Sequence, residues 1–167
     1  MGTFEQFDQE LREQLPSVIE EALSAEANDK IYSIAFVTTD DYYGFYVASD
    51  HDTENNPHNI WEFFEWKQAI YPKFLYQTVV EIVESSPIDF TKRSDEKWNF
   101  GQQLMGLLNK HIQSLQSEVF EKHGYQKEDI LFFMTMSDGD YMDELLVESV
   151  KLFNQSETIE KYQISLE

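Results

Sequence analysis

The sequence predicts an α/β fold, or an α+β fold with the same order of elements, in which about four helices cover a small mixed sheet. Three patterns lead to this prediction. Residues 31–49 read as a hairpin near the N-terminus, residues 130–137 contain a continuous apolar run of strand length, and the intervening segments carry apolar residues at helical spacing. The apolar run is typical of a central strand that is buried on both faces.

The first helix is expected over residues 4–23, where apolar residues recur every three or four positions. Thr3 is a suitable N-cap. Pro16 lies inside the pattern and lacks the backbone N–H that a helix interior uses, so a kink or two consecutive helices is expected.

Residues 31–39 and 44–49 are rich in β-branched and aromatic side chains and form the predicted hairpin around a turn at 40–43. Residues 51–58 are polar and indicate a loop. Residues 60–71 fit a short helix followed by extended chain, and residues 74–83 fit a helix that begins after Pro72.

Residues 88–97 read as a polar connection, and one long helix is expected from Trp98 to Phe120, with Gly124 as its C-cap. The predicted strand at 130–136 is followed by a helix over 140–153. Residues 159–166 fit an additional edge strand. No stretch has the composition of a linker, so residues 1–167 are expected to form one globular domain.

The chain has 32 Asp and Glu against 12 Lys and Arg, which gives a formal net charge of -20. Such a charge repels nucleic acids and anionic membranes and attracts basic proteins, so we expect a basic protein partner and no nucleic-acid or membrane partner. Aromatic residues make up 15% of the chain and provide the core that many acidic chains lack. Cysteine is absent, which is consistent with the cytoplasm.

The segment Ser137-Asp138-Gly139-Asp140 follows the predicted central strand, at the place where α/β sheets commonly bind ligands. Two interpretations are open. Asp138 and Asp140 could hold a divalent metal ion. Alternatively, the segment is a glycine turn in which Asp140 caps the next helix, and this interpretation is the more economical one.

The most distinctive cluster contains five aromatic residues and two acids between positions 61 and 71. Most of the rings are expected in the core, and those left exposed would be anchors for a basic partner. The candidate binding residues are Asp50, Asp52, Glu54, Trp61, Glu62, Glu65 and Trp66.

Motifs of nucleophilic, zinc-protease and nucleotide chemistry do not occur, and we expect neither catalytic residues nor a cofactor. The sequence therefore favours a non-catalytic protein-binding module. The alternative is a divalent-metal-dependent hydrolase or transferase that uses Asp138 and Asp140.

Several segments occur in an order that resembles a known family. They are residues 31–36, the Ala-Ser-Asp stretch at 48–54, Trp61 with Glu65-Trp66, the strand at 130–134 with the turn at 137–140, and Ser149 with residues 152–154. This order resembles the bacterial domain-of-unknown-function family numbered 4303, over nearly the whole chain. The family carries no established activity. The resemblance implies a genomic setting near polymorphic toxin genes. The net charge of -20 favours an immunity-type inhibitor of a basic toxin, because an acidic surface can occupy the phosphate-binding cleft of a basic nuclease.

Overall fold

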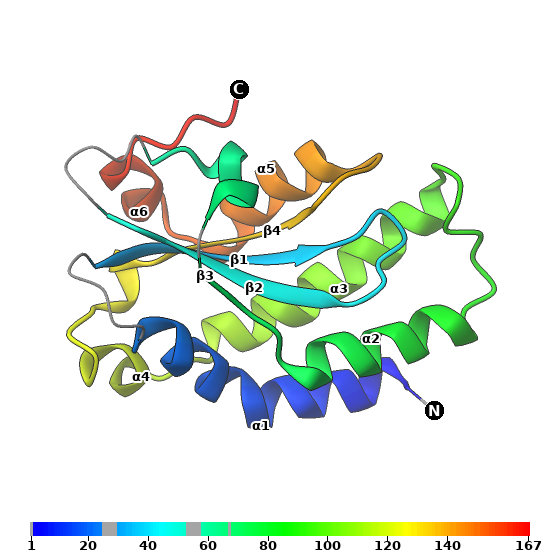
Figure 1. Ribbon diagram of the computed structural model, residues 1–167, viewed down its shortest axis with the longest axis horizontal. Coiled ribbons are helices and arrows are strands. Elements are labelled where there is room, and N and C mark those ends of the chain that lie inside the picture. The colour runs from blue at the N-terminus through cyan, green and yellow to red at the C-terminus, as the bar shows by residue number, and fades with distance from the viewer. Residues whose placement is uncertain (1, 25–29, 53–57, 67) are drawn as a thin grey trace.

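The computed structural model describes residues 2–24, 30–52, 58–66 and 68–167 (Figure 1). At its centre lies a four-stranded sheet with the order β3-β2-β1-β4. The strands are β1 (Ile31–Thr38), β2 (Phe45–His51), β3 (Gln68–Ile70) and β4 (Leu131–Met136). Because β1 pairs antiparallel with β2 and parallel with β4, the sheet is mixed, which confirms the predicted fold class.

Helices cover both faces of the sheet. In Figure 1, α1, α2 and α4 lie below the sheet, α5, α6 and the 3₁₀ helix η1 lie above it, and α3 runs diagonally behind the strands. The helices are α1 (Phe4–Leu23), η1 (Ile60–Glu65), α2 (Lys73–Ser85), α3 (Asp95–Gln113), α4 (Ser117–Glu121), η2 (Lys127–Asp129, 3₁₀), α5 (Met142–Phe153) and α6 (Ser156–Lys161). Two covered faces explain why all of β1 and β4 is buried and why 131–136 reads as a continuous apolar run.

The first helix begins at its predicted cap, since the Thr3 hydroxyl accepts a hydrogen bond from the Gln6 N–H at 3.0 Å. The helix continues through Pro16, so the expectation of two consecutive helices is wrong. Leu11, Leu15 and Ile19 are fully buried on one face of α1. The burial of this face stabilises the helix on both sides of the proline and offsets the missing backbone hydrogen bond.

The predicted long helix is two helices, because α3 ends at Gln113 and α4 begins at Ser117. Lys127 explains the break. Its ammonium group donates to the backbone carbonyl of Ile112 at 2.8 Å and to that of Gln113 at 3.1 Å, and these are among the carbonyls that a helix leaves unpaired at its end. Gly124, with φ of 84°, lies after α4 and does not cap α3.

The predicted edge strand at 159–166 is also wrong. Residues 156–161 form α6, and the chain beyond it is not a strand. Ile159, Ile164 and Leu166 nevertheless pack against the core on the α5 side of the sheet. The apolar pattern therefore predicts correctly that these residues pack against the core, although they do so from a helix and the chain that follows it.

The outer edge of β4 is covered by side chains of α5 and of the residue that follows it. The Met134 N–H donates to Ser149 Oγ at 2.8 Å, and the Ser149 hydroxyl lies 3.0 Å from the Met134 carbonyl. Asn154 accepts from the Phe132 N–H at 2.8 Å and donates to the Phe132 carbonyl at 2.7 Å. Backbone groups that would pair with another strand are thus satisfied internally.

We predict that Ser149→Ala lowers the free energy of unfolding by about 1–3 kcal/mol, because it leaves the buried N–H and carbonyl of Met134 without this partner. Urea denaturation measures the change. Ser117→Ala, at an exposed serine, is the matched control and should stay within about 0.5 kcal/mol of the wild type. Equal urea midpoints for the two variants would contradict the assigned role of Ser149.

Candidate functional site

The parallel strands β1 and β4 have their carboxyl ends side by side. The ammonium group of Lys97, on α3, contacts acidic residues that follow both strands. The Lys97 Nζ is 3.0 Å from Oδ1 of Asp40, which follows β1, and 3.6 Å from Oδ2 of Asp140, which follows β4. The backbone N–H of Asp140 also donates to Asp40 Oδ1, at 3.1 Å. We call Lys97, Asp40 and Asp140 the Lys97 cluster.

Lys97 has no exposed surface, whereas the Asp40 and Asp140 side chains are 42% and 41% exposed. A buried ammonium group is tolerated only when it is paired, and two carboxylates provide that pairing here. Burial alone would raise the pKa of Asp40, but hydrogen bonds from the Asp140 N–H and the Lys97 ammonium outweigh burial and lower that pKa. Asp40 is therefore charged at neutral pH.

Arg93 and Tyr141 connect the Lys97 cluster to neighbouring helices. The Arg93 guanidinium donates to the Asp140 carbonyl at 2.5 Å and to the Glu144 carboxylate at 2.9 Å, and it lies 4.5 Å from the centre of the Tyr141 ring. The Tyr141 hydroxyl donates to the carbonyl of Ser94, the N-cap residue of α3, at 2.8 Å. The first turns of α3 and α5 are therefore joined.

Two close approaches near the cluster require glycine. Gly139 has φ of 107°, and a Cβ at this position would collide with the Asp40 carboxylate. A Cβ on Gly101 would collide with the hydroxyl of Tyr42, which is fully buried. Burial raises the pKa of Tyr42, and the Tyr141 and Asp40 side chains raise it further, so the phenol is neutral.

The structure separates the two interpretations of the turn at 137–140. Tyr141 is the N-cap residue of α5 and no side chain caps this helix, so the expectation that Asp140 is the cap is wrong. Asp140 instead pairs with Lys97, and Asp138 is exposed. Within the described ranges, no three His, Cys, Asp or Glu side chains are grouped to share a metal ion. The metal site at Asp138 and Asp140 stays a hypothesis.

The aromatic cluster is less buried than the sequence predicts. Phe63 is buried, Trp61 and Trp66 are partly buried, and Phe64 and Tyr71 are 67% and 76% exposed. Trp66 packs edge-on against Phe133 of β4, with ring centres 5.7 Å apart.

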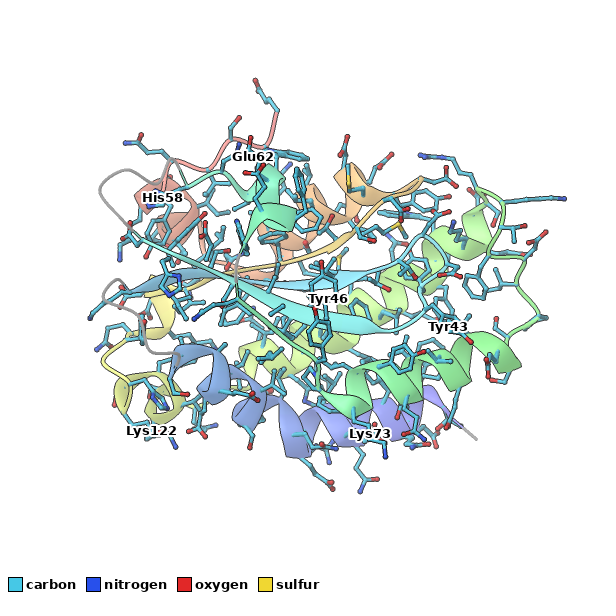
Figure 2. The ribbon with its side chains drawn as sticks, viewed as in Figure 1. Tyr43, Tyr46, His58, Glu62, Lys73 and Lys122 are labelled. Carbon is cyan, nitrogen blue, oxygen red and sulfur yellow. The ribbon has the colours of Figure 1, made fainter. Side chains whose placement is uncertain are left out.

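Glu62 and Glu65 are exposed beside these rings, and Figure 2 labels Glu62 on η1. We call Trp61, Glu62, Phe64, Glu65 and Trp66 the acidic–aromatic surface. It lies on η1 and the residue that follows it, on the α5 side of the sheet.

The predicted acidic residues at the end of β2 are already engaged. Asp50 is partly buried and accepts from the His51 N–H at 2.9 Å. Asp52 is 2.6 Å from the Nε2 atom of His58, whose ring centre is 4.5 Å from that of Tyr32. Glu54 lies outside the described residues. Asp50 and Asp52 are therefore held by contacts within the protein, and Asp52 is close to the acidic–aromatic surface, because its partner His58 lines the same hollow as Trp61.

Sequence reasoning missed Lys97, Asp40 and Arg93. It placed Lys97 in the polar connection at 88–97, although α3 begins at Asp95 and its start is marked by Ser94, which accepts from the Lys97 N–H at 3.1 Å. A serine followed by Asp95 and Glu96 is a usual helix start, and this signal could have placed Lys97 on a helix. Its burial and partners depend on distant segments that no local pattern reveals.

The fold and these sites define a small mixed α/β domain whose polar strand ends are joined by internal ion pairs. The chain belongs to the family described as Domain of unknown function (DUF4303), whose model matches residues 11–155. The predicted resemblance is thus confirmed. Comparisons with curated proteins and with solved structures found no significant match. Of the helices in the described ranges, none is long and apolar enough to span a bilayer.

We predict that Lys97→Met destabilises the protein by about 2 kcal/mol. Loss of one partner of a buried ion pair typically removes about 3–5 kcal/mol, and solvent at the two half-exposed carboxylates reduces this value. Lys151→Met, at an exposed lysine of α5, is the control and should change stability by less than about 0.5 kcal/mol. Urea denaturation of both variants tests the prediction, which fails if they are equally stable.

The lowered pKa of Asp40 predicts a pH dependence. A carboxylate whose pKa is lower in the folded state stabilises the protein above its unfolded pKa, near 3.8, and loses this effect as the pH falls through its folded pKa. The stability difference between wild type and Asp40→Asn should therefore be largest near neutral pH and shrink below about pH 4. Thermal or urea unfolding across this range measures it, and a constant difference would contradict the ionic role of Asp40.

Proposed function

We propose that this protein is a non-catalytic, cytoplasmic binding module that recognises a basic protein, and that it acts as an immunity-type inhibitor of a basic toxin. The observation that carries the proposal is the position of Phe64. Phe64 is 67% exposed, on a short helix where Glu62 and Glu65 are also exposed. Aromatic anchors beside charged residues are typical of the energetic centres of protein interfaces.

The residues of η1 that support Phe64 are well packed. Its neighbour Phe63 is buried, with its ring centre 6.4 Å from that of Phe133 in β4. The Trp61 indole N–H donates to the Ser165 carbonyl at 3.0 Å, which attaches η1 to the C-terminal tail. A surface held in this way loses little conformational freedom on binding, and this favours affinity.

The charge of the surface specifies the kind of partner. None of the lysine and arginine side chains in the described ranges forms an ion pair with Glu62 or Glu65. Together with the net charge of -20, these carboxylates attract a basic surface and accelerate its association. An acidic surface of this kind would occupy the phosphate-binding cleft of a basic nuclease.

The alternative, a metal-dependent hydrolase or transferase that uses Asp138 and Asp140, is less well supported. For Asp140 to bind a metal ion, its carboxylate would have to leave the buried Lys97 ammonium or share it with the metal. The first change leaves the buried ammonium with one carboxylate partner, and the second places the metal ion next to Lys97, so both are electrostatically unfavourable. The Lys97 cluster is better explained as a structural connection.

The test is affinity capture from an extract of the native cells at low and high salt, with mass spectrometry of the retained proteins. We expect a basic protein that is retained at low salt and weakened at high salt. Phe64→Ala, and Glu62→Lys with Glu65→Lys, should each reduce its retention about tenfold or more, as expected for loss of an interface anchor or its charges.

The matched controls are Leu152→Ala, which shortens an exposed apolar side chain on α5, and Glu148→Lys, which reverses an exposed charge on the same helix. Both should retain the partner as the wild type does. Equal retention by all variants would exclude the acidic–aromatic surface. Retention of no protein at either salt concentration would contradict the binding-module proposal, and metal titration of Asp138→Ala and Asp140→Ala would follow.

A further inference from the structure

The two edges of the sheet differ. Side chains of Ser149 and Asn154 cover the outer edge of β4. At the opposite edge of the sheet, β3 pairs with β2 through Gln68, Ala69 and Ile70. No further strand within the described ranges pairs with β3. The edge strand of a sheet has backbone N–H and carbonyl groups that can pair with an extended chain.

A hollow of about 300 Å³ lies beside this edge. The residues that line it come from α1, β2 and β3 and include Glu21, Ala22, Val47 and Ile70. Glu21 is exposed, whereas Ala22 and Val47 are buried. An apolar wall with a carboxylate at its rim suits the aliphatic stem and cationic end of a lysine or arginine.

The other face of the same edge carries two tyrosines. Tyr46 precedes Val47 in β2, so its side chain lies on the opposite face of the sheet, and Tyr71 directly follows β3. Their ring centres are 5.6 Å apart, and Tyr71 is 76% exposed. Figure 2 shows Tyr46 near β3, over the centre of the sheet. Exposed tyrosine rings bind cations and apolar side chains.

We propose that the β3 edge is a docking site for an extended basic segment of the partner protein, which adds a strand to the sheet. Alternate side chains of the segment enter the hollow beside Glu21 and contact the Tyr46–Tyr71 pair. This inference rests on the proposed function, because it assumes a basic partner, and it adds the site and the conformation of the bound segment. The acidic–aromatic surface ends at Trp66, shortly before β3, so one partner can contact both.

Charge selects this occupant over a second copy of the chain. Two copies of the chain, each with a net charge of -20, would repel one another, whereas a basic segment is attracted. The strand has only three residues, so backbone pairing alone would be weak. The hollow and the tyrosine pair must therefore contribute to affinity.

The experiment is a titration of the ¹⁵N-labelled full chain with an end-blocked heptapeptide of alternating lysine and valine, followed by amide chemical shifts. We expect saturable shifts at residues 68–71 and at Glu21. A peptide with the same side chains but methylated backbone nitrogens should bind at least about tenfold more weakly. Glu21→Lys and Tyr71→Ala should weaken binding by a similar factor, and Glu148→Lys should leave it unchanged.

The outcomes separate this inference from the proposed function. Equal binding of the methylated peptide would overturn strand addition and leave charge attraction intact. Shifts confined to residues 61–66 would also overturn it, while supporting the acidic–aromatic surface. Self-association of the protein through β3 would identify a second copy as the occupant and overturn the inference. Failure of both peptides to bind at low salt would count against this inference and against the basic partner.

Discussion

The burial of Lys97 is the constraint on which the arrangement of the domain depends. An ammonium group without exposed surface requires carboxylates within reach, and Asp40 and Asp140 meet this requirement only if β1 and β4 end side by side and α3 begins at their edge. Gly139 permits the close approach of the two strand ends. Arg93 and Tyr141 then connect the start of α3 with that of α5. One charged contact therefore positions elements that lie far apart in the sequence.

The ion pairs of Lys97 also bear on where a partner or ligand can bind. In many α/β proteins the carboxyl ends of parallel strands hold the ligand, but here these ends are occupied by internal ion pairs. The outer edge of β4 is covered by Ser149 and Asn154, two residues that also carry the family resemblance. The two most exposed of the large apolar side chains in the described ranges, Phe64 and Tyr71, lie instead on η1 and directly after β3, and this position favours recognition of a partner protein over chemistry at the strand ends.

Local sequence patterns predicted those elements that local physics determines. The hairpin, the short helix before β3 and the buried strand at 131–136 follow from residue type and period. The division between α3 and α4 could not be predicted, because no glycine or proline marks it and it depends on Lys127 reaching carbonyls fourteen and fifteen residues earlier. The burial of Lys97 and the exposure of Phe64 depend on tertiary contacts, so the sequence named the region of the aromatic surface but missed the Lys97 cluster.

Amide hydrogen exchange of the protein, free and in complex with its captured partner, tests whether the partner binds at η1 and β3, because it locates the contact without substitutions. Exchange reports protection of individual backbone segments. We predict slower exchange in the complex over residues 60–71, with little change at 137–141. Protection at 137–141 with unchanged exchange over 60–71 would contradict it and would place the functional site at the carboxyl ends of β1 and β4.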